Sequence, residues 1–437
     1  MSSPAPGALK QPILILAEGA TMAHPCRAYK LAQLLARDGH SVVFGTPEKF
    51  HSMFQPEAGI EKISIQSVQT ADFLQRIDRE KFPYTLKELR VQLVENLKLL
   101  RKYRPRAVVG DVRYTLPIAS FMEWVPCITL ADFHWSPLCQ TKFPVPDSVN
   151  TRRFGARLSK LVGPWILRLV LSLVFRPLNQ IRKENGFPGY PDIRRAYCDG
   201  DATFYVGFEH AATQQLEQNQ FFGGPLLWQG GSWGAFEVPQ VNNETPVALL
   251  SLGSSGNYSC FNTIVEGLLE SGVRVIASHP NPEKIPRDFL SRGLSAYKFL
   301  DFGKVLTKVD FMVGNGGSST IWGALCAGKP YLGVYSLLDQ AFCIEWFARG
   351  GGVLGLSSLE LKKESVAAAA RNLLQDRSYT DCARAYQDKF EQLGGDAFTV
   401  LQFNRVLKTL EEKNHESKSA GYRGMRLRRS PLSRAFA

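Results

Sequence analysis

The hydrophobic positions at the start of the chain alternate between short continuous runs and helical spacing. The run PILILA, residues 12–17, has the length of a buried strand, and from His24 apolar residues recur at intervals of three and four. Gly39 stands where a glycine commonly ends a helix, and SVVF, residues 41–44, predicts the next strand. The first sixty residues therefore predict a β-α-β unit.

The same pattern returns more than 200 residues later. A strand is predicted at 247–252 and a helix at 263–270 that ends near Gly272, followed by a strand at 273–277. Alternating strands and helices favour parallel sheets with helices on both faces. The predicted fold class is α/β, with two Rossmann-like domains that face each other across a cleft.

Composition shifts along the chain suggest where these domains begin and end. Residues 223–246 are rich in glycine, proline and polar residues, as a linker would be. The predicted division is a first domain at 1–225, a linker at 226–245, a second domain at 246–400, a C-terminal helix at 401–415 and a tail at 416–437.

The overall composition is that of a globular protein, with 44% hydrophobic and 21% charged residues. No apolar run reaches the roughly 18 residues that span a bilayer, and the N-terminal run is too short for a secretory signal, so we expect a cytoplasmic protein. The eight cysteines contain no C-x-x-C pair, which favours reduced, mostly buried thiols over a zinc site or disulfides.

The net charge of +12 is concentrated in two acid-free segments. From Lys418 onward there are six basic residues, which predicts a disordered, solvated tail. Residues 151–183 contain eight basic side chains among large apolar ones. This segment is either a partly buried helix pair or a peripheral membrane contact that meets anionic lipid. Nucleic acid is not expected as a partner, because no binding motif accompanies the charge.

Candidate chemistry begins with FMVGNGGSSTIWGALCAGKP, residues 311–330. Gly316 and Gly317 follow a predicted strand and precede a helix that starts near Ser318. Glycines let the backbone approach an anion, and the helix N-terminus favours negative charge, so we expect a phosphate group to bind there. The hydroxyls of Ser319 and Thr320, like that of Ser318, could donate further hydrogen bonds. A tight turn without a ligand is the alternative.

Two more polar loops follow predicted strands in the same half. LGSSG, residues 252–256, supplies Ser254, Ser255 and Gly256, and Asp339 and Gln340 follow the strand YLGVY. A carboxylate beside a carboxamide suits sugar hydroxyls. Because ligands bind at the carboxyl ends of parallel strands, three polar loops at one edge favour a binding site over isolated turns.

These residues resemble the donor signature of the UDP-glycosyltransferase family, which has the two-domain GT-B fold. The match is carried by NGGSSTIWGALCAGKP followed by LLDQ, by LNQIRKENGFPGY at 178–190, and by the spacing from His24 to DGH at 38–40. It resembles most the bacterial members that glycosylate small molecules such as macrolides. The resemblance covers nearly the whole chain except the tail.

The resemblance implies an inverting transfer of a hexose from a nucleotide sugar, by default UDP-linked, to an acceptor hydroxyl. His24 matches the family's catalytic base, and Asp111, which follows the predicted strand at 106–111, matches its partner. Imidazole suits this role because its ordinary pKa, about 6.5, leaves it neutral yet basic near physiological pH. Amides of the glycine loops would stabilise the leaving diphosphate. Neither a metal nor a further cofactor is implied.

Four residues at three places depart from the family pattern. Asn315 replaces a histidine before the glycine pair, although its amide could still donate to a phosphate oxygen. Gly323 stands where relatives carry a glutamate that holds the ribose. Asp301 and Phe302 replace a Pro-Gln pair, and Phe302 could pack on the nucleotide or belong to the core. An unusual donor pocket in an active enzyme is the favoured interpretation.

For the acceptor we expect a small, largely apolar hydroxylated or phenolic metabolite. Four aromatic residues of the first domain are candidates to hold it: Phe121, Trp124, Phe133 and Trp135. One alternative is a lipid acceptor at a membrane surface, with 151–183 as the docking segment. Another is a pseudoenzyme that only binds a sugar nucleotide, and a sugar-nucleotide epimerase is a weaker rival. The sequence does not fix the oligomeric state.

Overall fold

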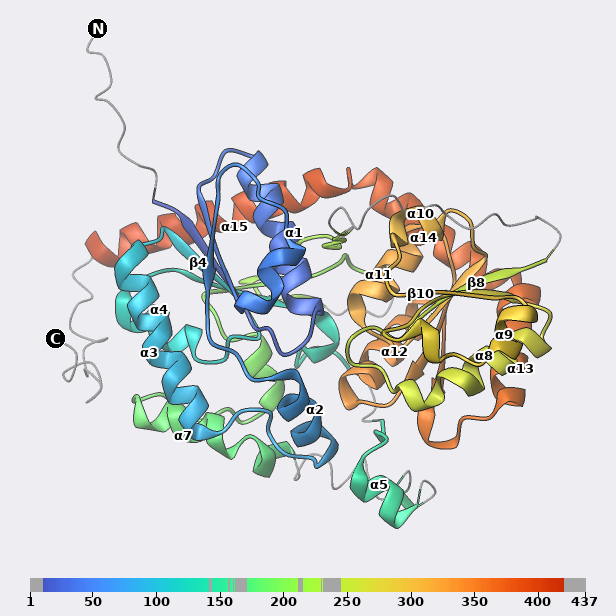
Figure 1. Cartoon of the computed structure of the whole chain (residues 1–437). Coiled ribbons are helices and arrows are strands. Elements are labelled where there is room, and N and C mark those ends of the chain that lie inside the picture. The colour runs from blue at the N-terminus through green and yellow to red at the C-terminus, as the bar shows by residue number, and fades with distance from the viewer. Residues whose placement is uncertain are drawn as a thin grey trace, which may run out of the picture.

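The computed structural model describes residues 11–140, 144–155, 171–210, 215–228 and 245–419, together with residues 158, 159, 161 and 230. Within these ranges the strands form two separate sheets, one in each half of the chain (Figure 1). Every strand pairing in both sheets is parallel. The predicted α/β fold with two Rossmann-like units is confirmed.

The first sheet has the strand order β3-β2-β1-β4-β5-β6-β7. Its strands are β1 (Ile13–Ala17), β2 (Val42–Thr46), β3 (Ile60–Ser64), β4 (Ala107–Asp111), β5 (Cys127–Ala131), β6 (Ala202–Tyr205) and β7 (Gln220–Phe222). The order reverses between β1 and β4, whose last residues, Ala17 and Asp111, are register partners. Such a reversal point is where open parallel sheets place their ligand sites.

The second sheet repeats this plan with the order β10-β9-β8-β11-β12-β13. Its strands are β8 (Val247–Ser251), β9 (Arg274–Ser278), β10 (Leu294–Tyr297), β11 (Phe311–Gly314), β12 (Tyr331–Tyr335) and β13 (Val353–Ser357). Here the reversal lies between β8 and β11, the two strands that precede the predicted glycine-serine loops. The repeated sequence pattern therefore corresponds to a repeated topology.

Helices cover both faces of both sheets. The longer ones are α1 (Ala23–Arg37), α2 (Thr70–Asp78), α3 (Leu86–Tyr103), α4 (Leu116–Glu123), α7 (Arg176–Glu184), α8 (Phe261–Glu270), α11 (Ser318–Cys326), α12 (Leu338–Gly350), α13 (Lys363–Gln375), α14 (Arg377–Gln392) and α15 (Asp396–Ser419). The shorter helices are α5 (Val149–Phe154), α9 (Arg287–Ser291) and α10 (Phe302–Leu306), and short 3-10 turns include η2 (Phe133–Trp135) and η3 (Ile193–Tyr197).

The central strands of both sheets are buried on both sides, so their successive residues enter different cores. Ile13 and Ile15 of β1 pack with α1 and α15, whereas Leu14 and Leu16 pack with α3, α4 and α7. In the second sheet, α8 and α13 cover one face and α11, α12 and α14 the other. This two-sided burial explains why the strands appear in the sequence as continuous apolar runs.

The last helix connects the two halves. In Figure 1, α15 runs in red along the top, from the second half back over the first. Its residue Phe403 packs against Phe204 of β6, and Arg106, just before β4, pairs with Glu411. Through α15 the described chain therefore returns from the second half to the first.

Parts of three predicted segments lie outside the described residues: most of the linker at 226–245, much of the acid-free segment at 151–183 and most of the tail at 416–437. Among the residues that the structure describes, no helix combines the length and apolar character required to span a bilayer.

Candidate functional site

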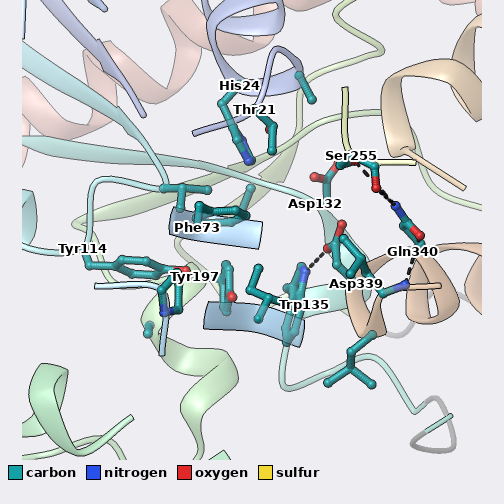
Figure 2. A pocket seen from close by; sticks show the side chains of 18 of the residues that line it. Thr21, His24, Phe73, Tyr114, Asp132, Trp135, Tyr197, Ser255, Asp339 and Gln340 are labelled. Carbon is teal, nitrogen blue, oxygen red and sulfur yellow. Dashed lines mark hydrogen bonds between the residues drawn. The ribbon is translucent and has the colours of Figure 1, made fainter. Parts of the chain in front are cut away.

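A cavity of about 250 Å³ lies between the two sheets, where the strands of both end. Loops that follow β1, β4 and β5 line it from the first half, and loops that follow β8, β11 and β12 line it from the second. Figure 2 shows His24 on one side of this space and Ser255, Asp339 and Gln340 on another. The topology alone brings these distant loops together.

His24 and Asp111 form a hydrogen-bonded pair at the first sheet. His24 lies in the first turn of α1, and Asp111 is the last residue of β4. Imidazole Nδ1 is 2.9 Å from Asp111 Oδ1, and the carboxylate is fully buried. Burial opposes ionisation of Asp111, but Arg27 and His24 outweigh it and hold its pKa below the ordinary value. The ionised carboxylate therefore fixes the ring through Nδ1 and leaves Nε2 to exchange a proton.

Arg27 connects this pair to a third carboxylate. Its Nε and Nη2 donate to the two oxygens of Asp111 at 2.5 and 2.6 Å, and its Nη1 donates to Asp132 Oδ2 at 2.5 Å. Ser318 Oγ, in the other half of the chain, donates to Asp132 Oδ1 at 2.6 Å. A continuous polar network thus runs from the imidazole to the first turn of α11.

Sequence reasoning missed both Arg27 and Asp132, although each left a signal. Arg27 is a charged residue next to the apolar face of a helix, one turn after His24, and is 3% exposed. Asp132 follows the buried strand β5 just as Asp111 ends β4. A buried arginine requires acidic partners, and polar residues at strand ends are the natural candidates.

The turn before α11 is as tight as predicted, but its amides are arranged differently. Gly316 has φ +87°, a conformation that favours glycine, and its N–H donates to the Tyr331 hydroxyl at 3.0 Å. Neither Gly316 nor Thr320 lines the cavity, and the Thr320 hydroxyl donates to the Gly317 carbonyl. The residues that reach the cavity are Gly317, Ser318 and Ser319. The Thr320 amide donates to the Gly317 carbonyl, whereas the amides of Ser318 and Ser319, at the very start of the helix, are suited to an anion.

Asn315 has a different role from the one its position suggested. Its side chain is buried, with Nδ2 donating to Ser255 Oγ at 3.1 Å and Oδ1 accepting from the Gly317 amide at 3.3 Å. It therefore ties the two glycine-serine loops together and does not line the cavity. In this structure the Asn315 amide donates to the neighbouring loop, and its expected hydrogen bond to a phosphate stays a prediction.

Of the loop after β8, only Ser255 lines the cavity. Ser254 instead accepts a hydrogen bond from the Met22 amide at 3.2 Å, which joins the two halves. A Cβ on Gly256 would lie 2.2 Å from the Leu252 carbonyl oxygen, so glycine is needed for the turn itself. Phe302, at the start of α10, packs on the core and lies outside the cavity lining.

Asp339 and Gln340, in the first turn of α12, differ in their availability. The Asp339 side chain is 54% exposed, and it accepts hydrogen bonds from His134 Nε2 at 3.0 Å and from Trp135 Nε1. Gln340 is buried: its Oε1 accepts from the Ser336 and Leu337 amides, and its Nε2 donates to the Ser255 carbonyl at 3.1 Å. Gln340 thus caps α12, and Asp339 is the more accessible polar group.

Only one of the four predicted acceptor aromatics lines the cavity. Trp135 does, whereas Phe133 is buried against Tyr205. Phe121 and Trp124 line a second cavity, beside the start of β5 and away from His24. The structure therefore does not bring these three residues to the cavity, because aromatic character does not reveal which side of a sheet a helix covers.

Other apolar residues form the wall that sequence reasoning assigned to those aromatics. Trp135 stacks on Tyr197 with ring centroids 4.4 Å apart, and Tyr114 meets Tyr197 edge-on at 5.6 Å. Further apolar lining comes from α2 and from the segment before α7, namely Phe73, Ile77, Leu171, Val174 and Phe175. The cavity therefore has a polar end at α11 and an apolar, aromatic end at α2.

No protein-family model matches the chain. It is 29% identical over 391 residues to a PGL/p-HBAD biosynthesis rhamnosyltransferase of Mycobacterium bovis (strain BCG / Pasteur 1173P2). The matched residues cover 89% of this chain and 86% of that protein. A shorter relative from the same strain, 29% identical over 68% of this chain and 82% of its own length, is named an inactive PGL/p-HBAD biosynthesis glycosyltransferase.

Solved structures show the same architecture. The glycotransferase of kitacinnamycin superimposes with a TM-score of 0.67 at 17% identity, over 91% of this chain and 99% of that one. The spinosyn rhamnosyltransferase SpnG, complexed with thymidine diphosphate, superimposes with a TM-score of 0.61 at 16% identity. The superposition covers 87% of this chain and 96% of that one. These structures confirm the GT-B fold. Together with the relatives' names, they confirm the predicted resemblance and the prediction of a glycosyltransferase.

Proposed function

We propose that this chain is an inverting glycosyltransferase that moves a hexose from a nucleotide sugar to a hydroxyl of a largely apolar acceptor. One observation carries the proposal: the His24 imidazole, held by Asp111, and the first turn of α11 line the same cavity from opposite halves of the chain. A base and an anion site that line one cavity are what a displacement at a sugar carbon requires.

In this mechanism His24 Nε2 takes the proton of the acceptor hydroxyl while the oxygen attacks the anomeric carbon. Asp111 stabilises the imidazolium that forms. The bond from the anomeric carbon to the diphosphate breaks on the opposite face, which inverts the configuration. Amides of the first turn of α11 and the Ser318 and Ser319 hydroxyls stabilise the charge that develops on the leaving diphosphate.

The shape of the cavity supports the class of acceptor. Its aromatic end, built by Tyr114, Trp135 and Tyr197, suits a flat, phenolic or otherwise apolar molecule whose hydroxyl reaches His24. The donor nucleotide is the less constrained part: the sequence favours uridine, and one similar structure holds thymidine diphosphate. Both nucleotides therefore belong in the test, and neither a metal nor a further cofactor is part of the proposal.

The test is a His24→Ala variant, with His40→Ala as its control. His40 bonds to Asn404 outside the cavity. With UDP-glucose or dTDP-rhamnose and a panel of phenols, His24→Ala loses transfer by about 10²-fold or more but still gains thermal stability from the nucleotide sugar. The anomeric configuration of the product, read by NMR, reports inversion. A His24→Ala enzyme with full activity, or a native protein that binds no nucleotide sugar, would refute the proposal.

A second candidate keeps the reaction and uses a lipid acceptor at a membrane surface. The observation that favours it is a group of exposed apolar side chains, Phe154, Leu158, Leu161 and Leu173, close in sequence to Arg152 and Arg153. Leu171, Val174 and Phe175, which line the apolar end of the cavity, belong to the same region of the chain. Cosedimentation with anionic vesicles, before and after Arg152→Gln and Arg153→Gln, distinguishes this candidate from a soluble acceptor.

A further inference from the structure

Asp132 lies between the proposed base and the proposed phosphate site. Arg27 holds one of its oxygens, and Ser318 of α11 donates to the other. The side chain is 12% exposed and lines the cavity, where Figure 2 shows it near Ser255 and Asp339. A sugar that bridges the first turn of α11 and His24 would have to pass this carboxylate.

The Ser318 hydroxyl cannot donate to two acceptors at once when a nucleotide sugar is bound. It is one of the groups that would hydrogen-bond the diphosphate, yet here its single proton is given to Asp132. If the diphosphate takes that proton, Asp132 Oδ1 loses its hydrogen bond although its side chain is only 12% exposed to water. Leaving a mostly buried carboxylate oxygen without a donor costs about 1–3 kcal/mol, so a new donor is needed.

Only certain groups can replace Ser318 as the hydrogen-bond donor to Asp132 Oδ1. A phosphate oxygen cannot supply it, because two anions repel each other. A hydroxyl of the sugar attached to that phosphate can, since it arrives with the diphosphate and carries a proton. The Ser318 hydroxyl thus stands where a sugar hydroxyl would bind.

We propose that Asp132 binds a hydroxyl of the transferred sugar, and that Arg27 is the positioning residue that fixes both Asp132 and Asp111. The inference rests on the proposed function and deepens it. Arg27 grips Asp111 through two nitrogens and Asp132 through a third, so the carboxylate that orients the base and the carboxylate that holds the sugar share one rigid support. Asp339, held by His134 and Trp135, offers a second carboxylate in the same cavity.

The experiment compares the affinity for a nucleoside diphosphate with that for its sugar derivative, by titration calorimetry. The probe pairs are UDP with UDP-glucose and thymidine diphosphate with dTDP-rhamnose, and the tighter-binding pair is used. Asp132→Asn keeps the shape of the side chain but weakens it as an acceptor. We expect it to bind the nucleotide sugar about ten-fold more weakly or worse, and the bare diphosphate within two-fold of the native protein.

Two further variants make the test specific. Ser318→Ala removes the hydroxyl that the diphosphate would take, so it should weaken both members of the pair by the same factor. Asp288→Asn, an exposed carboxylate of α9 that does not line the cavity, should change neither. Deoxy analogues of the better sugar nucleotide identify the hydroxyl: the Asp132→Asn loss should vanish for the analogue that lacks it.

The outcomes separate the inference from the proposed function. If Asp132→Asn weakens both ligands equally, or neither, Asp132 does not bind the sugar and the inference is overturned, even though the glycosyltransferase proposal stands. If the native protein binds none of the probes, the proposed function fails first. Circular dichroism of each variant checks that it is folded. Arg27→Lys keeps the positive charge but cannot make all three hydrogen bonds to Asp111 and Asp132, so it should also weaken binding of the nucleotide sugar and not of the diphosphate.

Discussion

Several charged side chains near the cleft are buried, and the described structure gives each of them a counter-ion. Arg27 forms ion pairs with Asp111 and Asp132. Arg113 pairs with Glu95, and its Nη1 lies 3.6 Å from Glu18 Oε2. Removing one member of such a set leaves an uncompensated charge, which is more damaging than never having the pair. Substitutions here therefore affect stability as well as chemistry, and isosteric changes are the informative ones.

Glu18 gives a prediction about pH. It follows β1, is 1% exposed and accepts hydrogen bonds from Gly19 N at 3.1 Å, Gln92 Nε2 at 3.3 Å and the Ser67 hydroxyl. Burial raises its pKa to about 7, although Arg113 opposes the shift. Between pH 4.5 and 7 the native state then binds more protons than the unfolded state, so the free energy of unfolding falls as pH rises, by about 3 kcal/mol in all.

A Glu18→Gln variant, which cannot ionise, should lack this loss. We expect the melting temperature of the native protein to fall relative to that of Glu18→Gln as pH increases from 5 to 8, when both are measured by differential scanning fluorimetry. Glu412→Gln, at an exposed position of α15, is the control for general charge effects. A difference between Glu18→Gln and the native protein that stays constant over this range would contradict the prediction.

At the scale of single residues, the resemblance to the UDP-glycosyltransferase family singled out His24 and Asp111, and the structure places the two side chains within hydrogen-bond distance. The sequence could not show that the side chains of Asn315 and Gln340 form hydrogen bonds with a neighbouring loop. A polar residue in a binding motif can face the ligand or support the loop, and only the three-dimensional contacts distinguish the two.

At the scale of elements, two of the glycines in α11 and the turn before it, Gly316 and Gly323, differ in whether a side chain could replace them. A Cβ on Gly316 would lie 2.5 Å from Ile344 Cδ1 and 3.1 Å from the Gln340 carbonyl oxygen, and the residue has positive φ. Gly323, inside the helix, has no atom within 4 Å of an added Cβ. One glycine is required by the turn, whereas the other only weakens the helix.

We therefore expect opposite effects from the same substitution. Gly316→Ala should destabilise the protein by about 2 kcal/mol or more through strain and overlap, and should weaken nucleotide binding. Gly323→Ala should stabilise it by about 0.5–1 kcal/mol, because alanine is the better helix former. Chemical denaturation followed by circular dichroism measures both. Shifts of the same sign would show that the two positions are not distinguished by space and backbone angle.

The boundaries of elements were well predicted where periodicity and punctuation agreed. The helix expected from His24 is α1, which begins at Ala23, and the strand expected at 247–252 is β8, which ends at Ser251. Gly39 and Gly272 both have positive φ just after α1 and α8, as helix-ending glycines do. The acceptor wall was harder, because α2 and the segment before α7 carry no motif that marks their apolar residues as cavity lining.

At the scale of the whole molecule, the two halves are joined by contacts that cross the cleft and by α15. Ser318 reaches Asp132, Asp339 receives His134 and Trp135, and the Asp147 amide donates to the Ser336 carbonyl at 2.8 Å. No local pattern predicts which residues of one half will meet those of the other. The sequence predicted the existence of a cleft from the repeated topology, but not the polar network that spans it.

The helix α15 offers a test of how the halves depend on each other. Phe403 is fully buried against Phe204 of β6, whereas Leu401, two residues earlier, is 64% exposed. Phe403→Ala should cost about 3–5 kcal/mol through lost burial and the cavity left behind, and Leu401→Ala should change stability by less than about 0.5 kcal/mol.

The location of the damage is the sharper prediction. Because α15 follows the second half but packs on the first, Phe403→Ala should loosen its docking while leaving the second sheet intact. Hydrogen exchange read by mass spectrometry should speed up in α15, β6 and β7 but not in β8 to β13, and Leu401→Ala should match the native protein throughout. Equal acceleration in both sheets would instead mean that the halves unfold as one cooperative unit, with the interface between them as strong as either core.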